Sequence, residues 1–177
     1  MPTVEPKQQA FAVWITGLPA SGKSTITNAL KSQLAERGVD AAVLESDALR
    51  KVFAADYSAP GREAFYRQMV YVGSLLVEHG VPVIFDATAN LRVYRDRARR
   101  EIARFIEVYL DVPLEICMAR DPKGIYASAK AGQASNVPGL QDSYEAPASP
   151  DVLVHGDDPE SDARRIIEKL AEKGCVE

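Results

Sequence analysis

The sequence predicts an α/β fold of three layers, in which a parallel five-stranded sheet is flanked by helices on both faces. Two observations support this prediction. Short apolar runs alternate along the chain with segments of helical periodicity, as in sheets whose parallel strands are joined by helices. The chain has 177 residues, which suits one compact domain with a sizeable core. We therefore expect residues 1–177 to form a single domain.

The strands are predicted at five apolar runs, which read FAVWIT from residue 11, AAVLE from 41, VPVIF from 81, FIEVYL from 105 and DVLV from 151. Between them, apolar side chains recur at helical spacing in three groups: Ile26, Leu30 and Leu34; Met69, Gly73, Leu76 and Val77; and Ala163, Ile166, Ile167 and Leu170. Gly38 and Gly80 follow the first two groups, and a glycine in this place is typical of a helix end.

Residues 121–150 do not fit this alternation. The segment is rich in Gly, Pro, Ser and Ala and is too long for an ordinary connection between two elements. Long loops of this kind often close over a binding site. We therefore predict a lid region at about residues 121–150.

The charge balance and the hydropathy exclude some classes of partner. Lys and Arg number 21 against 25 Asp and Glu, so the formal net charge is −4 and no broad basic surface for nucleic acid is expected. No apolar run approaches the roughly 20 residues of a membrane span, and the polar start MPTVEPKQQ is unlike a targeting segment. We expect a cytoplasmic protein that binds neither nucleic acid nor membrane.

The two cysteines have no metal-binding or disulfide spacing. We expect Cys117 to be buried in a helix. Cys175 is expected to lie at a frayed C-terminus.

The segment GLPASGKS, residues 17–24, lies between the first predicted strand and the first predicted helix. Gly17 and Gly22 let the backbone turn so that successive N–H groups face phosphate oxygens, and the next helix adds its positive dipole end. In such a P-loop, Lys23 contacts the β- and γ-phosphates and the hydroxyl of Ser24 holds Mg²⁺. A chance match is the alternative, and the position between strand and helix argues against it. The predicted ATP-binding residues here are Gly17, Leu18, Pro19, Ala20, Ser21, Gly22, Lys23, Ser24 and Thr25.

A second group of functional residues is predicted in LESDALRKVF, where Asp47 and Arg50 lie three residues apart at the start of a helix. This spacing puts both side chains on one helix face, towards the strand ends at which ligands bind in such sheets. A carboxylate there can orient or deprotonate an acceptor hydroxyl or hold the metal, and an arginine can hold an acceptor anion. Capping of the helix by Asp47 is the alternative, and it does not exclude catalysis. The predicted catalytic residues are therefore Lys23, Asp47 and Arg50.

A nucleotide site alone does not define the reaction, because switches, motors and kinases share it. The chain is small, lacks the guanine-reading sequence NKxD and carries a long polar lid region. These features favour an ATP-dependent kinase of a small molecule. A non-catalytic nucleotide-binding regulator is the alternative, although it needs neither an acceptor carboxylate nor a lid.

The second half of the chain carries a family resemblance. FIEVYLDVPLEICMARDPKGIYASAKAGQ, followed by PGL and SYEAP, resembles adenylylsulfate kinases, and the similarity extends over nearly the whole sequence. The resemblance implies transfer of the γ-phosphoryl group of ATP to the 3′-hydroxyl of adenosine 5′-phosphosulfate, a step of sulfate activation. It also implies a homodimer, a place for Arg120 near the ATP base and an acceptor contact from Lys123 in the lid.

The elements around the acceptor agree with the family only in part. ESDALR keeps Asp47 and Arg50 of the family's DGDNVR, and YSAPGR stands at FSEEDR. Arg62 then keeps an anion contact, and Tyr57 replaces the phenylalanine that stacks on the substrate adenine. The residues that the resemblance places around the acceptor are Asp47, Arg50, Tyr57, Arg62, Phe65, Thr88, Ala89, Lys123 and Val137.

Three further positions depart from the family pattern. Phe65 replaces a substrate-binding asparagine, and Ala89 replaces the serine of FISPYR, which here reads ATANLR. Val137 replaces the phenylalanine that closes over the adenine. Because an aromatic face on a base contributes about 1–3 kcal/mol, Val137 is expected to weaken selection of adenine.

A second resemblance concerns the neighbouring strand. VIFDATANLRVYRDRAR is similar to the strand-ending DATN element of P-loop kinases of the polynucleotide-kinase type, although Ala89 interrupts it. An Asp after an apolar strand beside the P-loop can support Mg²⁺, so Asp86 competes with Asp47 for that role, unless it only caps the strand end. This resemblance leaves open a kinase that acts on another small hydroxylated or nucleotide-linked anion.

Overall fold

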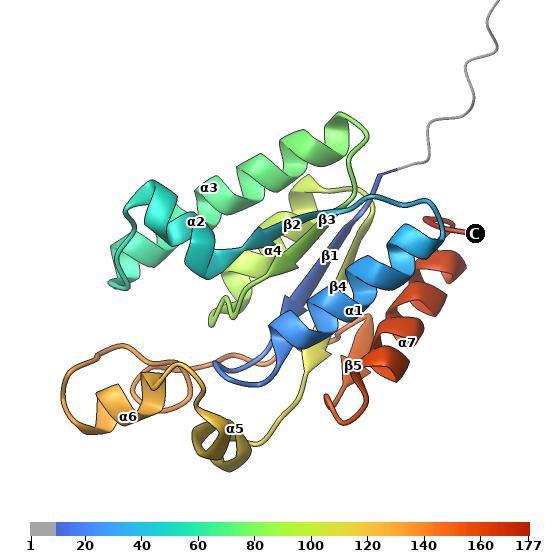
Figure 1. The fold of residues 1–177 in the computed structure, drawn as a ribbon. Helices are drawn as coiled ribbons and strands as arrows, with labels where there is room; N and C mark the ends of the chain where they lie inside the picture. The colour runs from blue at the N-terminus through green and yellow to red at the C-terminus, as the bar shows by residue number, and fades with distance from the viewer. Residues whose placement is uncertain (1–9) are drawn as a thin grey trace, which may run out of the picture.

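The chain forms a five-stranded parallel sheet between two layers of helices, which confirms the predicted fold class (Figure 1). The computed structural model describes residues 10–177. The expectation of no targeting segment rests on MPTVEPKQQ, which lies outside the described residues. The strands are arranged in the order β2-β3-β1-β4-β5, so the first strand is central.

The strands occupy the predicted apolar runs. Their bounds are β1 Ala12–Thr16, β2 Ala42–Glu45, β3 Val83–Asp86, β4 Phe105–Leu110 and β5 Val152–Val154. The helices are α1 Lys23–Glu36, α2 Ser46–Phe53, α3 Ala59–Glu78, α4 Arg92–Glu101, α5 Leu114–Arg120, α6 Ile125–Lys130 and α7 Pro159–Glu172. No helix in the described part of the chain is long and apolar enough to cross a membrane.

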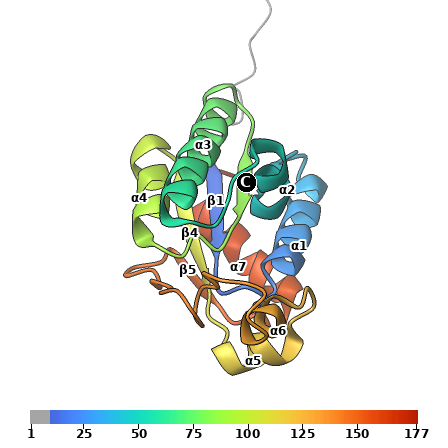
Figure 2. The ribbon, with the colours of Figure 1, turned by 90° about the vertical axis from the view of Figure 1, so that its left-hand side faces the viewer.

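Each face of the sheet buries its own apolar cluster, because successive side chains of a strand point to opposite faces. Val13 and Ile15 of β1 pack with the apolar sides of α1 and α7. Trp14, between them in sequence, packs on the other face with α3 and α4. In Figure 2, α3 and α4 lie on one side of β1, and α1 and α7 lie on the other.

The lid region lies beyond the carboxyl ends of β1 and β4 (Figure 1). Residues 121–150 are loop except for the short helix α6. Tyr126 ties this helix to the P-loop, because its hydroxyl donates to the carbonyl oxygen of Pro19 at 2.8 Å. The sheet therefore presents the P-loop and the lid region to the same space.

One local alternative is excluded and one local expectation needs correction. Asp47 does not cap α2, since Glu45 is the N-cap and its carboxylate accepts hydrogen bonds from the backbone N–H groups of Asp47 and Ala48. The side chain of Asp47 is thereby left for other contacts. Cys175 is buried rather than frayed, because the chain turns back after α7 and its N–H bonds to Leu170 O at 2.8 Å.

Gly73 marks the closest approach of α3 to the sheet. A Cβ atom at this position would lie 2.1 Å from Cζ of Phe85, whose ring stacks on Trp14 with the centroids 4.6 Å apart. We expect Gly73→Ala to lower the free energy of unfolding by about 1–3 kcal/mol despite the better helix propensity of alanine. Urea unfolding measures this change. Ser74→Ala, one residue further along α3, should change stability little, and equal effects of both substitutions would contradict the close packing.

Candidate active site

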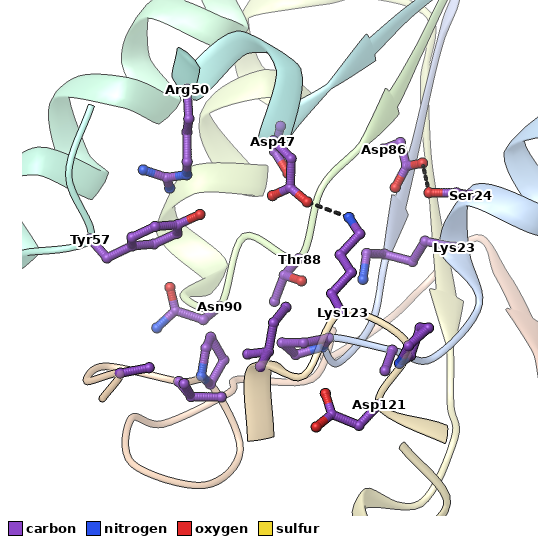
Figure 3. Close-up of a pocket in the computed structure, with 18 of the residues that line it drawn as sticks. Lys23, Ser24, Asp47, Arg50, Tyr57, Asp86, Thr88, Asn90, Asp121 and Lys123 are labelled. Carbon is purple, nitrogen blue, oxygen red and sulfur yellow. Dashed lines mark hydrogen bonds and ion pairs between the residues drawn. The ribbon is translucent and has the colours of Figure 1, made fainter. Parts of the chain in front are cut away.

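A cavity of about 710 Å³ opens at the carboxyl ends of the strands. Its walls come from the P-loop, the start of α2, the start of α3, the end of β3 and the lid region. Figure 3 shows Lys23, Asp86 and Asp47 facing this space from three different elements. Parallel α/β sheets bind ligands at this end, so the cavity is the candidate active site.

The P-loop has the close-packed backbone that a phosphate cradle requires. Gly22 adopts a left-handed conformation with φ of 102° just before α1, which few other residues accept. At Gly17 a Cβ atom would lie 2.7 Å from the carbonyl oxygen of Leu110 and 2.9 Å from Oγ of Ser21. That Ser21 hydroxyl is buried and has no hydrogen-bond partner among residues 10–177. The loop therefore fits a bound phosphate chain, with the dipole of α1 behind it.

The ammonium group of Lys23 is enclosed by the P-loop itself. Nζ donates hydrogen bonds to the carbonyl oxygens of Gly17 at 3.2 Å and Leu18 at 3.0 Å. Burial lowers the pKa of Lys23 below its ordinary value, and the charges of Asp86 and Asp47 oppose this shift. A negatively charged ligand in the cavity would favour the charged ammonium in the same way.

Ser24 and Asp86 form a direct contact between α1 and the end of β3. Oγ of Ser24 donates to Oδ2 of Asp86 at 2.8 Å. Asp86 reaches this position because β3 pairs in parallel with β1, which places it beside Ile15 just before the P-loop. Burial raises the pKa of the Asp86 carboxyl, against the opposing charge of Lys23.

This pair fits Mg²⁺, which prefers hydroxyl and carboxylate oxygens. Within residues 10–177, no group of three or more His, Cys, Asp or Glu side chains is placed to hold a metal ion alone. An ion at Ser24 and Asp86 would therefore take its other ligands from phosphate oxygens and water, as Mg²⁺ commonly does. Asp47 does not contact Ser24, so the geometry favours Asp86 for the metal-linked role.

Asp47 instead makes contact with the lid region. Its Oδ2 atom lies 2.5 Å from Nζ of Lys123, and both side chains are well exposed. Such exposed pairs contribute little to stability, up to about 1 kcal/mol. The ion pair joins the start of α2 to the lid region and lies close to Lys23 of the P-loop (Figure 3).

Arg50 is held rigidly by aromatic rings. Its guanidinium carbon lies 4.4 Å from the ring centroid of Tyr57 and 4.0 Å from that of Phe65, and Nη1 donates to the carbonyl oxygen of Asp56 at 2.9 Å. Cation–π contacts of this kind strengthen when they are shielded from water, and Arg50 is buried. The arginine therefore presents a fixed positive charge to the cavity.

Arg62 is also buried, but its partners belong to the lid region. Nη1 donates to Oδ2 of Asp142 at 2.6 Å, and Nη2 donates to the carbonyl oxygen of Asn136. Arg62 lines the cavity. An acceptor anion that binds Arg62 would therefore either share the guanidinium with the carboxylate of Asp142 or displace that carboxylate.

The remaining predicted residues divide into those that line the cavity and those that do not. Tyr57, Thr88, Lys123 and Val137 line it on the acceptor side, and Arg120 lines it near the P-loop. Of the P-loop residues, Pro19, Ala20, Gly22, Lys23, Ser24 and Thr25 line the cavity, whereas Gly17, Leu18 and Ser21 form the backbone behind them.

Phe65 and Ala89 correct the acceptor-site prediction, because both are fully buried and neither lines the cavity. Phe65 lies beneath Arg50 and packs edge-on against Tyr66. Ala89 turns its backbone away, with its N–H donating to the Tyr66 hydroxyl at 3.0 Å. These two residues can act on a ligand only through their neighbours.

Sequence reasoning missed several lining residues, namely Glu45, Tyr66, Asn90 and Asn136. Asn90 stands within ATANLR, directly after Ala89, where the family's FISPYR has proline. A polar residue in place of an apolar one, next to a strand end, was a signal that could have identified it.

Comparisons with known proteins agree over most of the chain. The family described as adenylylsulphate kinase matches residues 9–155. An adenylyl-sulfate kinase of Microcystis aeruginosa is 36% identical over 174 residues, covering 96% of each protein. One of Rippkaea orientalis is 37% identical over 174 residues, again covering 96% of each.

Solved structures show the same arrangement. The APS kinase CysC of Mycobacterium tuberculosis, in complex with AMPPNP and APS, superposes with a TM-score of 0.88 at 34% identity, covering 92% of this chain and 98% of that one. A sugar kinase from Janibacter superposes with a TM-score of 0.68 at 22% identity, covering 95% and 99%. The second similarity extends to the fold alone.

Proposed function

The chain belongs to the adenylylsulfate kinase family, and we propose that it transfers the γ-phosphoryl group of ATP to the 3′-hydroxyl of adenosine 5′-phosphosulfate. The products are ADP and 3′-phosphoadenylyl sulfate, the activated form of sulfate. The observation that carries this conclusion is a single cavity that joins a P-loop, with Lys23 and the Ser24–Asp86 pair, to an arginine-bearing acceptor wall under a lid region. The family match covers all of these elements.

Catalysis of phosphoryl transfer is mainly positioning and stabilisation of charge. Lys23 and the N–H groups of the P-loop hold the phosphates of ATP. Ser24 and Asp86 would hold Mg²⁺, which would supply positive charge to the phosphates. Asp47 orients the acceptor hydroxyl and accepts its proton. Asp47 must give up its ion pair with Lys123 to make this contact. Lys123 is then free to turn towards the phosphates or the acceptor.

The acceptor anion is held by Arg50, whose guanidinium is already immobilised by Tyr57 and Phe65. Arg62 adds a second positive charge on the same wall. Arg120 borders the nucleotide, where Nη1 lies 3.4 Å from the carbonyl oxygen of Ser21. The lid region excludes water from the site once both substrates are bound.

Transfer is direct in this proposal. The family pattern has a serine at the position of Ala89, and alanine has no nucleophile that could carry a phosphate. ATP and the acceptor must then occupy the cavity together, and initial-rate plots should intersect rather than run parallel.

A second candidate is a kinase of the same family whose acceptor is another small hydroxylated or nucleotide-linked anion. Phe65 and Ala89 give no polar contact to the cavity, and Val137 offers an aliphatic side chain where the family stacks a phenylalanine. The DATAN segment, which brings Asp86 to Ser24, is the feature similar to polynucleotide-kinase-type enzymes.

An acceptor panel distinguishes the two candidates. The protein is incubated with ATP and Mg²⁺ and with either adenosine 5′-phosphosulfate or a set of nucleotides, sugars and alcohols, and ADP release is followed. We expect the sulfonucleotide to give the highest kcat/KM. No transfer to it at saturation, with turnover of another acceptor, would establish the second candidate instead.

The assembly and location are further parts of the proposal. The family resemblance supports a homodimer, and we propose a cytoplasmic location. Sedimentation at several protein concentrations would reveal the dimer.

A further inference from the structure

Asn90 is a buried amide on the acceptor wall of the cavity. It follows β3 by four residues, is 5% exposed and lines the cavity with Thr88 and Tyr57. Its backbone carbonyl accepts a hydrogen bond from Glu145 N at 2.7 Å, so the main chain at this point is bonded to the last part of the lid region. A buried amide that faces a ligand site needs a partner for each polar atom.

The orientation of this amide is determined by its neighbour. Nδ2 donates to the carbonyl oxygen of Ser143 at 3.0 Å. A carbonyl oxygen can only accept, so the amide cannot be turned over without placing two oxygens together. Oδ1 must therefore be the atom that faces the cavity.

In the part of the chain that the structure describes, residues 10–177, Oδ1 of Asn90 has no hydrogen-bond donor. Figure 3 shows this oxygen pointing towards Tyr57. The atom is thus a fixed acceptor of hydrogen bonds, aimed into the cavity. It suits a neutral N–H or O–H donor and repels phosphate and sulfate oxygens.

The position of Asn90 indicates which hydrogen-bond donor of the sulfonucleotide it can meet. A sulfonucleotide offers the amino group of its base and the ribose hydroxyls, whereas its phosphosulfate has only acceptor oxygens at neutral pH. In Figure 3 the oxygen of Asn90 points towards Tyr57, whereas Asp47, which is assigned to the 3′-hydroxyl, lies beside Lys123 and nearer to Lys23. The base, stacked on Tyr57, is therefore the part of the acceptor nearest to Asn90.

We propose that Asn90 is a specificity-determining residue that accepts a hydrogen bond from the exocyclic amino group of the acceptor's base. An asparagine amide oxygen reads the 6-amino group of adenine in the same way in nucleic acids. The contact selects adenine in a site where Val137 provides no aromatic face. This inference rests on the proposed function, since it concerns the base of the sulfonucleotide.

The test compares kcat/KM for adenosine 5′-phosphosulfate with that for inosine 5′-phosphosulfate, in which an oxo group replaces the 6-amino group. The native protein should prefer the adenosine compound by about tenfold, because the oxo group loses a hydrogen bond and faces Oδ1. Asn90→Leu should reduce this preference to about twofold or less. Asn90→Asp keeps an acceptor oxygen and should retain the preference even if the loss of the Ser143 contact lowers both values.

Gln141→Leu is the matched control for a loosened lid loop. Gln141 bonds to Ala134 O and Val137 N within the lid region, but it does not line the cavity. Gln141→Leu should change kcat/KM for both substrates by the same factor. Thermal unfolding shows whether each variant is folded.

Three outcomes would overturn the inference. If Asn90→Leu keeps the native preference for adenosine over inosine, Asn90 does not read the base. A third substrate, 2′-deoxyadenosine 5′-phosphosulfate, tests the ribose in the same assay. If Asn90→Leu abolishes only the native preference for the ribose compound over this 2′-deoxy analogue, Asn90 reads the ribose. If the native protein does not phosphorylate adenosine 5′-phosphosulfate at all, the proposed function fails and this inference fails with it, which is distinct from turnover without an Asn90 effect.

Discussion

Replacing Lys23 with alanine is expected to abolish measurable phosphoryl transfer, a loss of about three orders of magnitude in kcat. Lys23 is the one P-loop side chain whose positive charge lies inside the loop, 3.0 Å from Leu18 O and 3.2 Å from Gly17 O. The transferring phosphoryl group carries its charge on oxygens that this ammonium group is placed to meet. Without the ammonium, the P-loop itself can stabilise the developing charge only through its backbone N–H groups. ADP release under saturating ATP and acceptor measures the loss.

The fold should survive this substitution. Burial lowers the pKa of Lys23, which means that the folded protein holds the charged ammonium at a cost. Thermal unfolding should therefore be close to native. Lys31→Ala, on an exposed position of the same helix, is the control and should keep native turnover. Near-native turnover of Lys23→Ala would remove the P-loop from the mechanism.

Asp47→Asn and Asp86→Asn are expected to lower turnover by about two orders of magnitude each, but for different reasons. Asp86 contacts Ser24, so its amide variant should also require a higher concentration of Mg²⁺. Asp47 contacts Lys123 across the acceptor side of the cavity, so its variant should bind ATP almost normally. Initial rates against Mg²⁺ concentration, and calorimetry with ATP, separate the two roles.

The exposed carboxylate of Asp40 provides the control, and Asp40→Asn should behave as the native protein does. A silent Asp47→Asn together with an inactive Asp86→Asn would move the acceptor carboxylate to the end of β3. That result would favour a mechanism closer to the polynucleotide-kinase type. Loss of ATP binding in both variants would contradict the division of roles.

The fold was predictable because its signals are local. The five apolar runs and the helical periodicities specify which residues should be buried, and the structure buries most of them on the two faces of the sheet. Leu153 is an exception, because it is exposed. The P-loop was predictable for the same reason, since residues 17–24 form one continuous segment between β1 and α1. The alternative that Asp47 caps α2 is excluded because the helix already begins at Ser46, and the carboxylate of Glu45 accepts from the N–H groups of Asp47 and Ala48.

The acceptor site was less predictable because its parts meet only in three dimensions. The contact between Ser24 and Asp86 depends on the pairing of β1 with β3, which sequence spacing does not reveal. Phe65 occupies a family ligand position, but a large apolar side chain on the inner face of α3 packs into the core instead. The family resemblance identified the position of Phe65 but could not show that its side chain points into the core.

The most direct test of the proposed function is the fate of the γ-phosphoryl group in a single turnover. ATP made chiral at the γ-phosphate with oxygen isotopes is mixed with Mg²⁺, adenosine 5′-phosphosulfate and excess protein, and the product is analysed by ³¹P NMR. The account predicts the phosphate on the 3′-oxygen with inverted configuration, as one in-line displacement requires. Retained configuration, or label isolated on the protein after mixing with ATP alone, would contradict direct transfer and direct the search to Ser58 or Thr88 as a nucleophile.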